Sequence, residues 1–230
     1  MKPIRYFFTA CAALLITISC ILAADAQPLT KAPSGKEWKS LFNGENLDGW
    51  HLKVTPDEHS KMSWAALNGV LVNVPPSQEG EHGIDLVSDV IVGSHELYIE
   101  FLVPKGSNSG VYLIGQYEIQ VFDSYGKENP GSGDCGGIYG KAAPLVNASL
   151  PAGHWQSLHA IFHQPVVENG KVVKKPRITV YHNGKKVIDD QEIEGVTGAA
   201  LNNEVIEEGP TYLQGNHGTV MYRNIYYKPL

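Results

Sequence analysis

Apolar and polar residues alternate strictly in several short runs of this sequence. In residues 96–103, Leu97, Ile99 and Phe101 occupy every second position, and Glu and Tyr stand between them. Successive side chains of a β-strand point to opposite faces, so a period of two predicts strands with one buried face. Further runs of this kind, broken by Gly, Pro and Asn, cover residues 117–122, 178–182, 185–188 and 220–227.

One pair of these runs is joined by Asn183 and Gly184. Asn-Gly favours a type I′ turn, in which both central residues need a positive φ, and therefore predicts a β-hairpin. No long stretch has the periodicity of an amphipathic helix. We therefore expect an all-β fold, a single-domain β-sandwich of two antiparallel sheets.

The N-terminus has the pattern of an export signal. Lys2 and Arg5 precede an apolar stretch at residues 6–24, and the small residues Ala24 and Ala26 form a cleavage site. We predict a signal peptide at 1–26, cut after Ala26, and a flexible linker at 27–36. The alternatives are an uncleaved membrane anchor and, less favoured, a lipoprotein attached through Cys20. The mature protein would be periplasmic or secreted, with no stable membrane insertion.

Charge and cysteine content exclude some classes of protein. The chain has 24 acidic against 18 basic side chains and no Lys/Arg stripe, which argues against a nucleic-acid partner. Cys11 and Cys20 belong to the predicted signal, so Cys135 would remain alone and no internal disulfide can form. About 200 residues remain after cleavage, enough to bury a core without disulfides.

The run at residues 117–123 carries the most chemical information. Alternation places Glu118 and Gln120 on one face, opposite the apolar set. Asp123 would join them if a β-bulge followed Val121, and bulges are common beside active sites. Two carboxyl groups on one sheet face could take and give protons in sugar chemistry. The plainer alternative is a solvated sheet face.

The string EIQVFD resembles the E-x-D-x-x-E signature of laminarinase-like glycoside hydrolases, which have a concanavalin A-like sandwich. In that family the first and last carboxylates act as nucleophile and general acid/base. Here Gln120 replaces the central Asp, and Asp123 is one methylene shorter than the expected Glu. These departures argue against ordinary retaining hydrolysis.

Residues 37–230 more closely resemble the 3-keto-disaccharide hydrolase domain family, through six motifs in family order. These motifs are residues 40–50 (SLFNGENLDGW), 105–113 (KGSNSGVYL), 117–123 (YEIQVFD), 135–140 (CGGIYG), 147–155 (NASLPAGHW) and positions within 209–225 (GPTYLQGNHGTVMYRNI). The resemblance implies a concanavalin A-like jelly roll, exported by bacteria, that cleaves glycosides already oxidised to a ketone at C3. It also implies a separate sugar 3-dehydrogenase that makes the ketone.

That chemistry needs a base for the C2 proton, a group that stabilises the enolate and an acid for the leaving oxygen. We assign Glu118 as base and Asp123 as acid. His217 could protonate the leaving group or polarise the ketone, although it could also simply cap a tight turn. Arg223 is the candidate for stabilising the enolate, with Lys141 as the reserve, and the alternative role of Arg223 is a structural ion pair. The expected substrate-binding residues are Gln120, Tyr112, Tyr139, Lys141 and Asn108.

No cofactor is predicted, and no metal ligands are assigned. The scattered histidines do not define a zinc site, and the stretch Asp85–Asp89 leaves calcium open without a recognisable calcium loop. Two non-enzymatic alternatives remain. A carbohydrate-binding module would rely on exposed aromatic residues, and a structural or adhesive domain would need no ionisable cluster.

Overall fold

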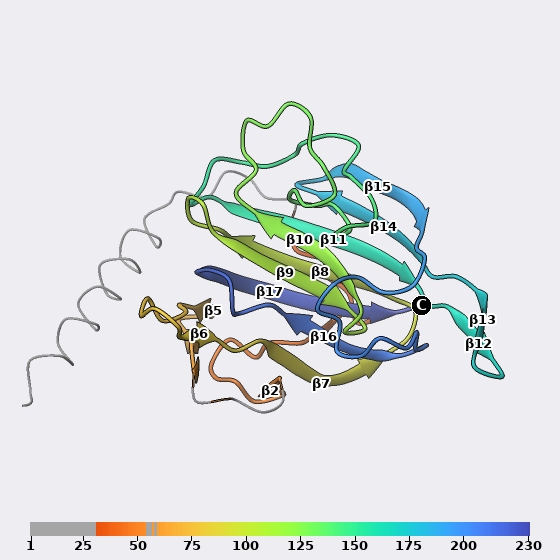
Figure 1. Cartoon of the computed structure of the whole chain (residues 1–230), viewed down its shortest axis with the longest axis horizontal. Coiled ribbons are helices and arrows are strands. Elements are labelled where there is room, and N and C mark those ends of the chain that lie inside the picture. The colour runs from red at the N-terminus through yellow and green to blue at the C-terminus, as the bar shows by residue number, and fades with distance from the viewer. Residues whose placement is uncertain (1–30, 54–56, 58) are drawn as a thin grey trace, which may run out of the picture.

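The computed structural model describes residues 31–230, apart from 54–56 and 58. Within this part of the chain there are only strands, turns and loops, arranged as two antiparallel sheets packed face to face (Figure 1). This confirms the all-β sandwich. The predicted signal peptide and residues 27–30 of the predicted linker fall outside the described residues.

The larger sheet has eight strands. Its order is β15 (Lys185–Glu192), β14 (Arg177–His182), β11 (Trp155–His163), β8 (His95–Leu102), β17 (Val220–Pro229), β5 (Val70–Asn73) and β4 (Trp64–Leu67), and β1 (Lys39–Ser40) pairs with β17. The first and last of the described strands, β1 and β17, therefore lie side by side, and most neighbours in space are distant in sequence. Such crossing connections are typical of jelly rolls.

The smaller sheet has five strands and carries the candidate site. Its order is β10 (Tyr117–Phe122), β9 (Asn108–Leu113), β16 (Gly209–Leu213), β7 (Leu86–Val92) and β2 (Trp50–Leu52). Two minor ribbons complete the fold, an antiparallel pair of β12 (Val166–Glu168) with β13 (Lys171–Lys174) and a parallel pair of β3 (Ser60–Lys61) with β6 (His82–Gly83).

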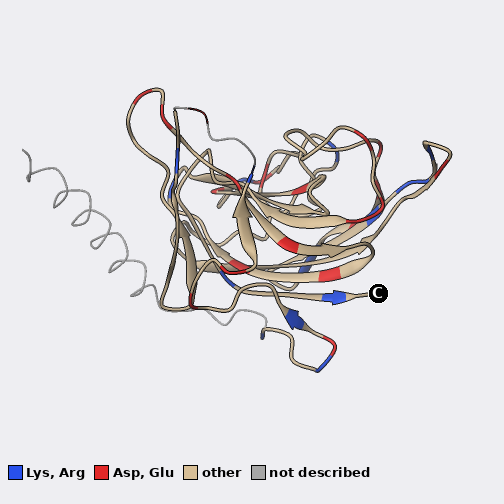
Figure 2. Cartoon of the chain, turned by 90° about the horizontal axis from the view of Figure 1, so that it is seen from below, with Lys and Arg blue, Asp and Glu red and all other residues tan. Residues whose placement is uncertain are grey.

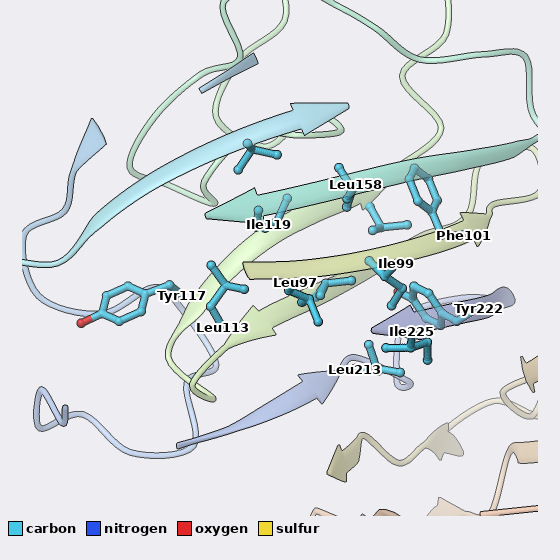
Figure 3. Close-up of a cluster of buried hydrophobic side chains, with 14 of the residues drawn as sticks. Leu97, Ile99, Phe101, Leu113, Tyr117, Ile119, Leu158, Leu213, Tyr222 and Ile225 are labelled. Atoms are coloured by element: carbon cyan, nitrogen blue, oxygen red, sulfur yellow. The ribbon is translucent and has the colours of Figure 1, made fainter. Parts of the chain in front are cut away.

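The core fills the space between the two sheets (Figure 3). Leu97, Ile99 and Phe101 of β8 point into it, as their alternation predicted, and each is at most 1% exposed. Ile119 of β10 belongs to the same cluster from the opposite sheet. Full burial of one such side chain contributes about 1.5–3 kcal/mol. The same alternation turns the polar residues of β10 away from the core.

The Asn-Gly hairpin is also confirmed. Asn183 and Gly184 have φ angles of 50° and 78°, and His182 pairs with Lys185 across the turn. The Asn183 side chain also ties the turn to a distant segment, because its Nδ2 donates to the Ala148 carbonyl at 2.9 Å.

The outer edge of β10 is covered by the segment at 135–139 instead of by a further strand. The Gly136 amide donates to the Gln120 carbonyl at 2.9 Å, and the Tyr139 amide donates to the Glu118 carbonyl at 3.1 Å. This pairing satisfies the edge and protects it from pairing with another chain. It also brings Tyr139 beside Glu118.

Acidic and basic residues are dispersed over the strands and loops (Figure 2). Many of them form exposed pairs, such as Arg177 with Asp190 at 2.8 Å. None of the described residues forms a helix that is long and apolar enough to cross a membrane. Cys135 is buried and free, and burial raises the pKa of its thiol to about 12.

Candidate active site

A cavity of about 160 Å³ lies on the outer face of the five-stranded sheet. It is lined by Asn108, Tyr112, Glu118, Gln120, Tyr139, Gly198, Ala199, Gln214 and His217. Two larger cavities, of about 300 and 500 Å³, lie elsewhere on the described surface. The first has no acidic side chain in its lining, and the second has only the exposed Asp89. Only the smallest of these three cavities combines a buried carboxyl group with a polar lining.

Strand register brings the lining residues together. Glu118 is the partner of Tyr112, and Gln120 is the partner of Gly110, in the antiparallel pairing of β10 with β9. Directly paired residues share a face of the sheet, so these side chains lie together on the face away from the core. On the other side of β9, the backbone N–H of Gln214 donates to the Gly110 carbonyl at 2.9 Å. This bond brings Gln214 beside the same cavity.

Glu118 is 3% exposed. Its Oε2 accepts a hydrogen bond of 2.8 Å from the Tyr112 hydroxyl. Burial raises the pKa of the Glu118 carboxyl to about 7, and the nearby charge of Asp85 also raises it, while the hydrogen bond from Tyr112 lowers it. A carboxyl group with a pKa near neutrality can both take and return a proton, as general acid–base catalysis requires.

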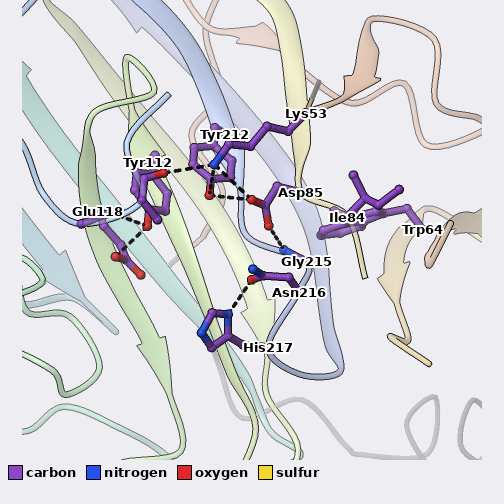
Figure 4. Close-up of polar contacts among 12 residues, drawn as sticks. Lys53, Trp64, Ile84, Asp85, Tyr112, Glu118, Tyr212, Gly215, Asn216 and His217 are labelled. Atoms are coloured by element: carbon purple, nitrogen blue, oxygen red, sulfur yellow. Dashed lines mark hydrogen bonds and ion pairs between the residues drawn. The ribbon is translucent and has the colours of Figure 1, made fainter. Parts of the chain in front are cut away.

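A polar network holds Tyr112 through the stacked ring of Tyr212 (Figure 4). The rings of Tyr112 and Tyr212 stack with centroids 4.1 Å apart, and the Tyr212 hydroxyl donates to Asp85 Oδ2 at 2.8 Å. Lys53 Nζ lies 3.4 Å from the same carboxylate oxygen and 3.2 Å from the Ala199 carbonyl. We call this the Lys53–Asp85–Tyr212 network. It fixes the Tyr112 ring and sets the charge near Glu118.

His217 lies on the loop between β16 and β17 and is exposed. Its Nδ1 lies 2.5 Å from Asn216 Oδ1 (Figure 4), and this contact orients the ring, which is part of the cavity lining. The structure therefore brings six of the sequence-predicted residues into one cavity, which are Glu118, Gln120, Tyr112, Tyr139, Asn108 and His217.

Asp123 does not reach the cavity. All six residue pairs of β10 with β9 are in register, so the expected bulge after Val121 is absent. The strand ends at Phe122, and Asp123 instead accepts a hydrogen bond of 2.9 Å from the Gly106 amide. The carboxylate closes the loop that leads into β9.

Arg223 and Lys141 also lie outside the cavity lining. Arg223 is on β17 of the other sheet, where its Nε donates to Glu100 Oε2 at 2.6 Å and its guanidinium lies 4.0 Å from the Trp155 ring centre. This is the structural ion pair considered as its alternative role. Lys141 is exposed and donates to the Glu194 carbonyl at 2.8 Å. Neither cation is placed to stabilise an enolate in this cavity.

The sequence reasoning missed Gln214, the Gly198–Ala199 segment and the Lys53–Asp85–Tyr212 network. Gln214 stands in the 209–225 motif, so its position beside His217 could have indicated it. The Gly198 carbonyl accepts a hydrogen bond of 3.0 Å from Tyr112, a contact between segments 86 residues apart. No local pattern reveals a contact of that kind.

The described residues contain no cluster of three or more His, Cys, Asp or Glu side chains able to hold a metal ion. In the stretch that left calcium open, Asp85 is bound by Tyr212 and by the Gly215 amide, and Asp89 lies 2.6 Å from His51. Asp85 and Asp89 therefore have separate partners and share no contact.

The fold and the cavity define the class of this protein, which is a jelly-roll sandwich with a buried carboxyl group of pKa about 7, that of Glu118, on the outer face of one sheet. Residues 37–228 match the profile of the 3-keto-alpha-glucoside-1,2-lyase-like domain. The chain belongs to this family.

Similar solved structures agree with the fold. A candidate glycosyl hydrolase from Parabacteroides distasonis is 24% identical with a TM-score of 0.71, over 91% of this chain and 95% of that one. A second from the same organism is 20% identical with a TM-score of 0.62, over 86% of this chain and 99% of that one. No protein with a curated description matches the sequence. The family points to glycoside hydrolase or lyase activity.

Proposed function

We propose that the cavity binds a glycoside oxidised to a ketone at C3 and cleaves it by elimination, with Glu118 as the base. The observation that carries the proposal is the buried carboxyl of Glu118, whose pKa of about 7 suits proton abstraction beside a carbonyl. Membership of the 3-keto-alpha-glucoside-1,2-lyase-like family supports the choice of substrate.

The ketone acidifies the proton on C2. The Glu118 carboxylate removes this proton, and the electron pair of the C–H bond forms an enolate between C2 and C3. Collapse of the enolate restores the ketone, forms the C1–C2 double bond and breaks the bond from C1 to the glycosidic oxygen. The departing oxygen takes up one proton. Addition of water across C1 and C2 then gives net hydrolysis, and release before this addition gives a lyase product.

The lining residues supply the other groups that the reaction needs. His217, at the rim, would protonate the departing oxygen. Tyr139 is exposed at the cavity wall, and its hydroxyl would donate a hydrogen bond to the enolate oxygen in place of Arg223. Tyr112 holds the Glu118 carboxylate in position through its hydroxyl. We assign no step to Asp123 or Lys141.

Glu118 is flanked by ionisable and amide side chains, whereas a binding module would be expected to present a platform of exposed aromatics. Tyr139 is the only exposed aromatic side chain besides the His217 ring in the cavity lining. This composition favours an enzyme over a non-catalytic carbohydrate-binding module.

We also propose that the protein acts outside the cytoplasm, on a sugar that another enzyme has oxidised. The N-terminal pattern supports export to the periplasm or beyond, and a separate sugar 3-dehydrogenase would supply the ketone.

The test compares two forms of one glucoside, plain and 3-keto, with the wild-type protein and the Glu118→Gln variant, with and without a chelator. We expect the wild type alone to cleave, and only the keto form. Binding of either sugar without any cleavage would instead indicate a binding module. Loss of activity with the chelator would show that a metal ion takes part.

A further inference from the structure

Three amide side chains line the cavity with unused hydrogen-bonding capacity. The side-chain oxygens of Asn108, Gln120 and Gln214 are buried and have no hydrogen-bond partner in the structure. Gln120 and Gln214 are only 4% and 6% exposed. Buried polar groups are nearly always paired, because an unpaired one costs about 1–3 kcal/mol. Three such groups around one cavity indicate that a ligand pairs them.

The partners of Gln120 limit how it can adjust. Its Nε2 donates to the Gly133 carbonyl at 3.2 Å, and this bond fixes the orientation of the amide. The Oε1 atom is left without a hydrogen-bond partner. Gln214 is held through its backbone, whose carbonyl accepts a hydrogen bond of 2.7 Å from the Ser109 hydroxyl. Its side chain is therefore anchored at the base and unpaired at the oxygen.

An amide both donates and accepts hydrogen bonds, and so does a hydroxyl group. A carboxylate ligand, in contrast, is normally held by Arg or Lys. The cavity lining contains neither. Lys53 is already bound to Asp85, and the Glu118 carboxyl would repel a second acid once ionised.

We propose that Asn108, Gln120 and Gln214 form an amide triad that binds the ring hydroxyls of an uncharged sugar and excludes uronic acids. This inference rests on the proposed function and adds to it the residues that select the ring. A cation is the other ligand that amide oxygens bind. The cavity lining offers a single carboxyl group, Glu118, and one of its oxygens is occupied by Tyr112, which favours the sugar.

The experiment measures equilibrium binding of methyl α-D-glucoside and methyl α-D-glucuronide by titration calorimetry, without any turnover. The wild type is expected to bind the glucoside at least ten-fold more tightly. Gln214→Met should weaken glucoside binding about ten-fold, the value of one lost hydrogen bond. The same variant should melt about 2–4 °C higher, because it removes an unpaired buried oxygen. A purely structural role for Gln214 would lower the melting temperature instead.

Gln120→Met is a second variant with the same expected loss of binding, in case Gln214→Met does not fold. Gln191→Leu, at an exposed position on the edge strand β15 of the other sheet, is the matched control and should bind like the wild type. Equal affinity for both sugars, or unchanged binding in both Met variants, would overturn the inference. So would sugar binding that requires added Ca²⁺ together with loss of Ca²⁺ binding in the variants. Because no cleavage is measured, failure of the elimination chemistry leaves this result readable.

Discussion

Gly110 leaves the space that the Glu118 carboxylate occupies. A Cβ built on Gly110 would overlap Glu118 Oε1, so the two positions on β9 and β10 are complementary in shape. Gly110 does not have a positive φ, and backbone conformation therefore does not explain the glycine. Gly110 of the KGSNSGVYL motif at residues 105–113 is thus explained by the site, since any larger residue would displace the proposed base.

Gly110→Ala should therefore reduce turnover of a 3-keto-glucoside by about 10- to 100-fold and destabilise the fold by about 1–3 kcal/mol, because the added methyl group forces the carboxylate to move. Steady-state kinetics and urea unfolding check both effects. Gly131→Ala is the control, because a Cβ there would make only an ordinary contact of 3.7 Å with Asp134 Oδ2 and the φ of Gly131 is not positive. Equal activity of the two variants would argue against the placement of Glu118.

The activity of the wild type should rise with pH through about 7. The base must be deprotonated, and burial places the pKa of Glu118 at about 7 instead of the ordinary 4.5. A profile of kcat/KM against pH for the free enzyme reports this ionisation. A profile that is flat between pH 5 and 8 would show that another group is the base.

Asp85 and Lys53 should shift that profile in opposite directions. Asp85→Asn removes a negative charge that raises the pKa of Glu118, so activity should extend to lower pH. Lys53→Met leaves Asp85 without its cation and should shift the profile to higher pH. Burial raises the pKa of Glu118 more than the charge of Asp85 does, so the pKa should stay above its ordinary value in both variants. Two shifts of the same sign would contradict the account of the network.

Arg223→Met should leave kcat/KM within about two-fold of the wild type but destabilise the protein by about 2 kcal/mol, because Glu100 loses a charge-assisted hydrogen bond while buried. Thermal unfolding and kinetics on the same samples separate the two effects. A large loss of activity in a folded variant would restore Arg223 to the catalytic machinery.

Acid should unfold the protein partly through His182. Its ring is fully buried, and burial lowers its pKa from 6.5 to about 3. The unfolded state binds the proton first, so stability is lost as pH falls below 6.5, by about 3 kcal/mol at pH 4. His182→Leu should flatten this dependence in urea titrations at several pH values, whereas replacement of the exposed His163 by Gln should not. An unchanged slope in His182→Leu would exclude this cause.

Local pattern was enough to predict the sandwich and to place Glu118 and Gln120 on one sheet face, whereas the other predicted lining residues came from the family resemblance. Alternation in β8 and β10 identified the core face, and the same alternation put Glu118 with Gln120. The prediction that Asp123 joins Glu118 was wrong, because a bulge depends on how two strands pair and the sequence of one strand does not determine this. The prediction that Arg223 lies at the site was wrong, because alternation indicates which face of a strand a residue is on but not which of the two sheets the strand joins. The Lys53–Asp85–Tyr212 network was invisible because its members come from three distant segments.

The most direct test of Glu118-driven elimination uses a 3-keto-glucoside deuterated at C2. If removal of that hydrogen by Glu118 begins the cleavage, the wild type should show a primary isotope effect on cleavage, and Glu118→Gln should lose activity by about 100-fold or more. Cleavage of the plain and keto glucosides at similar rates, with no isotope effect, would contradict the account and indicate direct displacement at C1.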